Sequence, residues 1–98
     1  MKSYGEYASR AFALHFRHPR PDPLRRADEV NLVAVSVALE KLSERETELL
    51  QAVYSIYSAT MPLRVAVPLA ASNTGVEEWR LWRLCRRAAD LFAEARGL

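Results

Sequence analysis

The sequence predicts an all-α protein, a compact bundle of about five helices that ends in a helix-turn-helix. Apolar residues recur at spacings of three and four along most of the 98 residues, which is the period of an amphipathic helix. Ala, Leu, Arg and Glu dominate, and only three glycines are present, so there is little material for β-hairpins. This length is typical of one domain, and we expect residues 1–98 to form one.

The first segment, residues 1–17, has helical spacing, and Ser3 with Glu6 matches a capping box at its start. Prolines at positions 19, 21 and 23 follow. They remove backbone donors and disfavour the α conformation in the residues before them. We therefore expect an extended connector over residues 18–25 and a helical core over residues 26–98.

Two helices are predicted in the middle of the chain. The first spans residues 27–42, and its expected inner face is Val30, Val33, Ala34, Val37, Ala38 and Lys41, widened by Leu32, Leu39 and Leu42. Ser43 and Glu46 form a second capping box, which opens a helix through about Ser58. The expected buried stripe of this helix is Thr47, Leu50, Val53, Tyr54 and Tyr57.

The last third, about residues 63–96, has the layout of a helix-turn-helix. Pro62 suits the first position of a helix, and Pro68 indicates a kink or a later start. Gly75 suits a left-handed turn, a long helix follows from Val76, and Gly97 is placed to end it. The expected inner face of the long helix is Leu81, Leu84, Cys85, Ala88, Leu91, Phe92 and Ala95.

Charge is distributed unevenly along the chain. Residues 1–26 hold six Lys/Arg against two acids, residues 27–61 two against six, and residues 62–98 six against four, which together give the net charge of +2. Basic ends and an acidic middle are compatible with nucleic-acid binding, although so small a net charge does not require it.

Residues 42–96 resemble the C-terminal DNA-reading domain of bacterial sigma factors. The resemblance begins with Leu-Ser-Glu-Arg-Glu at residues 42–46, followed by Leu49-Leu50 and Val53-Tyr54. Gly-Val-Glu at residues 75–77 falls where that family has Gly-Ile-Ser between its two reading helices. Further matches are Ala71 in the preceding helix and Leu81, Cys85, Ala88 and Phe92 in the recognition-helix core. The resemblance implies a small transcriptional regulator whose last helix lies in the major groove of double-stranded DNA.

Basic residues of the last third are the candidate DNA contacts. A guanidinium fork matches phosphate oxygens and the guanine edge, and several arginines share one face of the last helix. The candidates are Arg80, Arg83, Arg86, Arg87 and Arg64. The arginines of the basic N-terminal segment, including Arg20, Arg25 and Arg26, would add attraction to the DNA backbone. The alternative is a solvated face paired with Glu77, Asp90 and Glu94, and Glu77 and Glu78 oppose phosphate contact at the helix start.

Aromatic residues indicate a second function class, a protein–protein interaction module of the same fold that does not bind DNA. Its contact surface, toward a protein partner or a second copy in a homodimer, would be Trp79, Trp82, Tyr4, Tyr7 and Phe12. The two tryptophans could instead close the core against a neighbouring helix.

Several function classes receive no support. The sequence has no nucleophile elbow, phosphate-binding glycine loop or paired His-carboxylate motif, so we expect neither an enzyme nor a cofactor. His15 and His18 are too few ligands for zinc, so we expect no metal site, and Cys85 is expected to be a buried thiol. No apolar run reaches the ~20 residues of a membrane span and no signal peptide is recognisable, so we expect a cytoplasmic protein.

Overall fold

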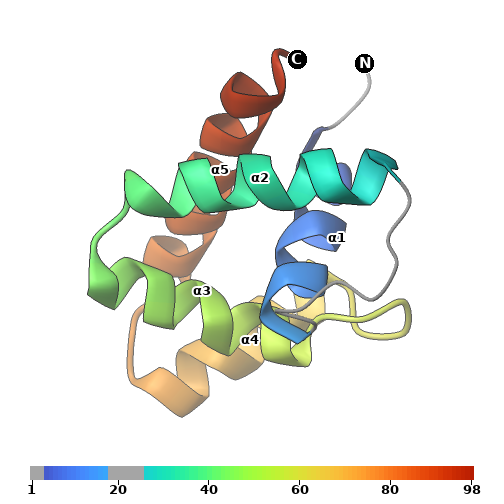
Figure 1. Cartoon of the computed structure of the whole chain (residues 1–98). Helices are drawn as coiled ribbons and strands as arrows, with labels where there is room; N and C mark the ends of the chain where they lie inside the picture. The colour runs from blue at the N-terminus through green and yellow to red at the C-terminus, as the bar shows by residue number, and fades with distance from the viewer. Residues whose placement is uncertain (1–3, 18–25) are drawn as a thin grey trace.

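Five α-helices make up the computed structural model, which describes residues 4–17 and 26–98 (Figure 1). The predicted all-α fold class is therefore confirmed. The predicted connector over residues 18–25 and the Ser3 cap lie outside the described residues, as do Arg20 and Arg25. The helices are α1 (Tyr4–Arg17), α2 (Arg26–Glu40), α3 (Glu44–Ile56), α4 (Leu63–Thr74) and α5 (Glu78–Arg96).

Helix α5 is the central element, because it packs against each of the other four helices. Helix α2 crosses α5, while α3 and α4 pack on each other (Figure 1). Helix α1 contacts α2, α3 and α5 and so completes the core. The radius of gyration of 12.7 Å agrees with the ~13 Å of a compact domain of about 100 residues.

An aromatic cluster joins α1, α3 and α5 at the centre of the core. The Phe12 ring stacks on Tyr54 at 5.6 Å and meets Phe92 at 6.2 Å, and all three side chains are fully buried or nearly so. Phe16 also stacks on Tyr54, and the guanidinium of Arg17 donates to the backbone carbonyl of Tyr57. These contacts fix α1 against the end of α3.

The predicted inner face of α2 is wrong. Val30, Val33 and Val37 are 39%, 64% and 37% exposed. The buried positions are instead Asn31, Ala34, Val35 and Ala38, with Leu42 beyond the helix end. The two alanines and Leu42 were placed correctly, Leu32 and Leu39 are half-buried, and Lys41 is exposed. Because α2 carries apolar residues on both faces, its periodicity could not decide which face meets α1 and α5.

Helix α3 agrees with its predicted start. The Ser43 hydroxyl accepts from the Glu46 amide at 3.1 Å, and the Glu46 carboxylate accepts from the Ser43 amide at 2.9 Å, so the capping box is confirmed. The helix ends at Ile56, two residues before the predicted end. Its buried side chains are Leu50, Val53 and Tyr54, all within the predicted stripe.

Helix α4 begins at Leu63 with Pro62 as its N-cap, and it runs on through Pro68. The later start considered from the sequence is therefore wrong. Pro68 has no amide hydrogen, which removes one bond to the carbonyl four residues earlier, on Arg64. Arg64 is exposed, so water can satisfy that carbonyl.

Candidate nucleic-acid interface

A tight turn sets the direction of α5. Gly75 has φ of 72° and donates its amide hydrogen to the Ala71 carbonyl, which is the predicted left-handed end of a helix. The Thr74 hydroxyl donates to the Ala70 carbonyl at 2.7 Å, and half-buried Val76 packs against the core. Helix α5 then begins at Glu78, two residues later than predicted.

The inner face of α5 fixes which side chains point to solvent. Its buried residues are Leu81, Leu84, Cys85, Ala88 and Phe92, as predicted. Of the other two predicted positions, Leu91 is half-buried and Ala95 is exposed. Arg83 and Arg86 lie opposite the buried stripe and are exposed, so nothing within the described chain covers the outer face of this helix near its start.

The two tryptophans are surface residues. Trp79 is 53% exposed and Trp82 is 37% exposed, so the possibility that they close the core is excluded. The Trp79 indole donates to a Glu77 carboxylate oxygen at 2.9 Å, and the Trp82 indole donates to a Glu78 carboxylate oxygen at 3.3 Å. Each glutamate at the helix start therefore holds an indole ring against the helix.

The four candidate arginines of α5 divide into two pairs. Arg80 is 3.4 Å from the Glu77 carboxylate, and its guanidinium lies 5.3 Å from the centre of the Trp79 ring. Arg87 is 3.5 Å from the carboxylate of Glu46 on α3. Arg83 and Arg86, by contrast, have no ion pair with any residue of the described ranges.

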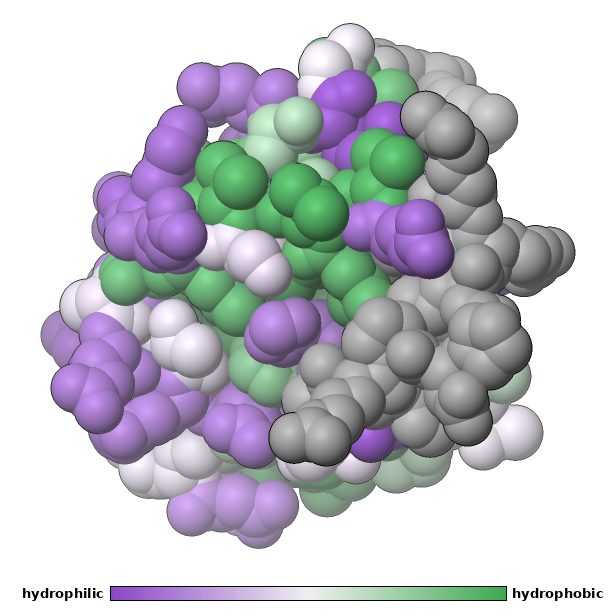
Figure 2. Space-filling model, in the orientation of Figure 1, coloured by the Kyte–Doolittle hydropathy of each residue, from purple (hydrophilic) through white to green (hydrophobic). Residues whose placement is uncertain are grey.

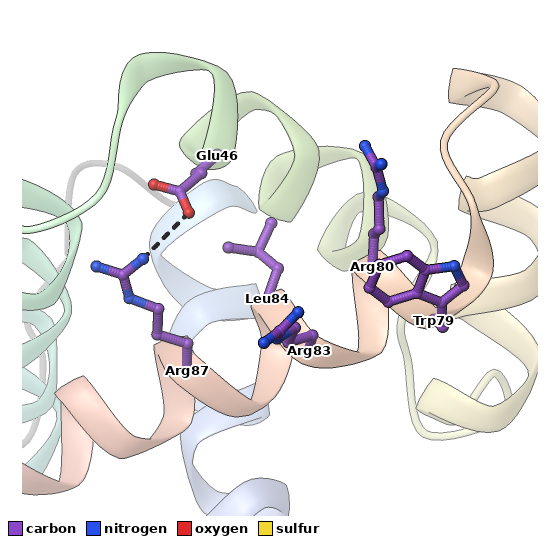
Figure 3. Close-up of a pocket in the computed structure, with 6 residues that line it drawn as sticks. All are labelled: Glu46, Trp79, Arg80, Arg83, Leu84 and Arg87. Carbon is purple, nitrogen blue, oxygen red and sulfur yellow. Dashed lines mark hydrogen bonds and ion pairs between the residues drawn. The ribbon is translucent and has the colours of Figure 1, made fainter.

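Three of these arginines line a shallow hollow between α3 and α5, with a volume of about 400 Å³. Figure 3 shows Arg87 reaching across to Glu46 at one end of the hollow, with Arg80 and Trp79 at the other. The hollow is lined by Glu46, Trp79, Arg80, Arg83, Leu84 and Arg87. Arg87 is paired with Glu46 and Arg80 with Glu77, so Arg83 carries the one unpaired guanidinium among the residues that line it.

Electrostatics at Glu46 follow from its position in the capping box. The hydrogen bond from the Ser43 backbone amide lowers the pKa of Glu46, and the charge of Arg87 adds to this effect. Glu46 therefore stays ionised and keeps its ion pair with Arg87 at neutral pH. The sequence identified Glu46 as a cap but not as a partner of Arg87, because 41 residues separate the two.

The remaining predicted site residues lie elsewhere. Arg64 is exposed on α4 and does not line the hollow. Phe12 is fully buried, so its proposed place on a partner surface is wrong; it serves as core because α1 packs inward. The side chain of Tyr4 lies outside the described residues.

Tyr7 takes part in a polar cluster that the sequence did not reveal. Its hydroxyl donates to the Asn31 side-chain oxygen at 3.1 Å, and Arg96 donates to the same oxygen at 2.7 Å. Its ring also meets the edge of Phe92 at 5.8 Å. Tyr7 thus joins α1, α2 and α5, although it is still 37% exposed. Asn31 and Arg96 are 65 residues apart, which hides the pairing from local pattern.

Cys85 is a buried thiol, as predicted from its place on the inner stripe. It is 5% exposed, and burial raises its pKa to about 11. The thiolate is the nucleophilic form of cysteine, and a thiol with this pKa stays protonated at neutral pH. Cys85 therefore serves as a core side chain.

Comparison with protein-family models, with curated proteins and with solved structures found no match. Within the described residues, none of the helices has both the length and the apolar character required to cross a bilayer.

Proposed function

We propose that the protein is a small DNA-binding regulator that contacts double-stranded DNA through the outer face of α5. The observation that carries the proposal is the pair Arg83 and Arg86, which are exposed and have no ion-pair partner in the described chain. An arginine that is already paired must lose its partner before it binds phosphate, whereas an unpaired one has only water to displace. Arg83 and Arg86 are therefore the two positions on α5 best prepared for a phosphate or a guanine edge.

The local architecture supports this proposal. A tight turn at Gly75 leads into a helix of 19 residues, and no described residue covers the outer face of this helix near its start. A helix that enters the major groove needs this arrangement, with its buried stripe on the protein side and its basic stripe on the DNA side. The resemblance of residues 42–96 to the DNA-reading domain of sigma factors supports the same function.

Glu77 and Glu78 are compatible with DNA contact further along the helix. Arg80 pairs with Glu77, and the carboxylates of Glu77 and Glu78 each accept a hydrogen bond from an indole. Both carboxylates are therefore already engaged by other groups of α5 when a phosphate approaches. Exposed pairs of this kind are weak, which leaves Arg80 free to exchange partners. We expect the first phosphate contacts at Arg83 and Arg86, with Arg80 and Arg87 contributing after their partners are displaced.

The test is binding of a fluorescent generic DNA duplex, followed by anisotropy at increasing salt. Each phosphate contact adds about 0.9 to the slope of log affinity against log salt. The double variant Arg83→Glu/Arg86→Glu should therefore reduce that slope by about two and weaken binding at low salt.

A matched variant separates this site from net charge. Lys41→Glu/Arg45→Glu changes two exposed basic residues, one just before α3 and one in its first turn, so it produces the same net charge without changing any residue of α5. It should retain most of the binding and slope. Equal losses in both double variants, or no binding by the native chain at low salt, would reject the proposal.

A protein-interaction module remains the second candidate, because Trp79 and Trp82 are exposed side by side. Exposed tryptophans are enriched where proteins contact partners. The variant Trp79→Ala/Trp82→Ala tests this candidate in the same assay. If this variant binds DNA with an unchanged salt slope, the two indoles do not contact DNA and are free for a protein partner. If the native chain does not bind DNA, the interaction module becomes the favoured candidate.

A further inference from the structure

The carboxylate of Glu46 makes two contacts at once, one within α3 and one with α5. One of its oxygens accepts from the Ser43 amide of the capping box at 2.9 Å, and the other lies 3.5 Å from the guanidinium of Arg87. Figure 3 shows this pair spanning one end of the hollow between the two helices. The cap therefore holds the carboxylate in the position from which it reaches Arg87.

Arg87 lies in the same stretch of α5 as Arg83, where we expect a first phosphate contact. The two arginines are four residues apart, so their side chains lie one turn apart on one helix face, and both line the hollow. A phosphate that reaches Arg83 is therefore close to Arg87 as well. Because Arg87 is already paired, this phosphate and the carboxylate of Glu46 compete for one guanidinium group.

Glu46 is better placed for this competition than Glu77, which pairs with Arg80. The Glu77 side chain is 63% exposed, whereas that of Glu46 is 33% exposed and is fixed by the hydrogen bond from the Ser43 amide. The same hydrogen bond lowers the pKa of Glu46, so its carboxylate is ionised at neutral pH. A carboxylate that is already held in place loses little side-chain entropy when it forms an ion pair.

Other charged residues at the start of α3 provide a matched comparison. Figure 2 shows hydrophilic side chains gathered at the left of the view, where α2 leads into α3 (Figure 1). Among the residues of α3, Glu48 resembles Glu46 in pairing with an arginine at 3.5 Å, but its partner is Arg45 of the same helix. Removing the charge of Glu48 therefore releases an arginine without changing the contacts of α5.

We propose that Glu46 is an autoinhibitory residue, whose carboxylate occupies Arg87 in place of a DNA phosphate and so lowers the affinity of this chain for generic DNA. The inference rests on the proposed function, because it requires DNA to contact α5. Arg87 binds a phosphate only after its pair with Glu46 is broken, so the free energy of that pair opposes binding. An ion pair of this exposure lowers the affinity by up to roughly fivefold, and salt screens it.

The variant Glu46→Gln tests the inference by fluorescence anisotropy with the full chain and a generic DNA duplex. Glutamine also completes a capping box, so the Ser43 amide keeps an acceptor and the helical circular dichroism should be unchanged. The variant should bind roughly threefold more tightly than the native chain at low salt, and the gain should shrink as the salt concentration rises. The control Glu48→Gln removes the same charge and should gain at most half as much affinity.

A second change identifies the arginine concerned. Glu46→Gln/Arg87→Gln has the net charge of the native chain but no guanidinium at position 87 to release, so it should bind DNA no more tightly than the native chain. If the native chain binds DNA and Glu46→Gln gains no more affinity than Glu48→Gln, the inference fails while the proposed function stands. The same holds if the double variant keeps the gain. Absence of binding by every one of these chains at low salt would reject both.

Discussion

The buried hydrogen bond between Ser9 and Tyr54 should have a distinctive energetic signature. The Ser9 hydroxyl on α1 lies 3.2 Å from the Tyr54 hydroxyl on α3, and both residues are about 1% exposed. Burial raises the pKa of Tyr54 well above its ordinary value, so the hydroxyl stays protonated and can donate. The bond joins α1 to α3 beside the stacked rings of Phe12 and Tyr54.

The two single variants, Ser9→Ala and Tyr54→Phe, should lose different amounts of stability. Ser9→Ala leaves the Tyr54 hydroxyl with only the weakly hydrogen-bonding thiol of Cys85 beside it, and a poorly satisfied buried hydroxyl costs about 1–3 kcal/mol. Tyr54→Phe leaves a serine that can rotate to the carbonyl four residues earlier in its own helix, so its cost should be nearer ~1 kcal/mol. In the double variant no polar group is stranded.

The double variant Ser9→Ala/Tyr54→Phe should therefore be at least as stable as Ser9→Ala. Urea unfolding followed by helical circular dichroism gives the four free energies of unfolding, and the double-mutant cycle isolates the coupling. Ser36→Ala, at an exposed position of α2, is the control and should change stability by less than about 0.5 kcal/mol. Additive losses in the double variant would refute the reasoning, because they would mean that neither hydroxyl depends on the other.

Three further predictions concern single positions. The pKa of Glu46 is lowered in the fold, so its carboxylate stabilises the fold fully above its ordinary pKa of 4.5. That contribution is lost as the pH falls through the lower pKa of the folded state. The urea midpoint of Glu46→Gln should therefore fall less steeply below pH 4.5 than that of the native chain. A disulfide reagent at neutral pH should label Cys85 only as fast as the fold opens, because burial holds its pKa at about 11, and rapid labelling of the folded chain would contradict this. Gly75→Ala should lower the free energy of unfolding in urea by about 1 kcal/mol, and Gly75→Asn should lower it less. An added Cβ meets nothing within 4 Å, so only the left-handed backbone is strained. An unchanged stability in Gly75→Ala would mean that the turn relaxes.

Local signals in the sequence were sufficient for the helices themselves. The capping box at Ser43 and Glu46 and the left-handed glycines at 75 and 97 are short-range features, and the structure has each of them. The inner stripe of α5 was also predictable, because arginines and acids fill its other face and leave one apolar side. The outward position of the α5 arginines follows directly from that stripe.

Tertiary structure decided everything that depends on which helix meets which. Helix α2 has two apolar faces, and only the docking of α1 and α5 determined that Asn31 and Val35 are buried while Val30, Val33 and Val37 are exposed. The same docking placed Phe12 in the core instead of on a surface, and it brought Arg87 to Glu46 and Arg96 to Asn31 across long stretches of chain. The physical reason is that periodicity records the apolar character of a face, whereas burial depends on a partner from a distant part of the chain. The sequence alone determined the helices and the basic face of α5, and the fold determined which of its arginines remain unpaired.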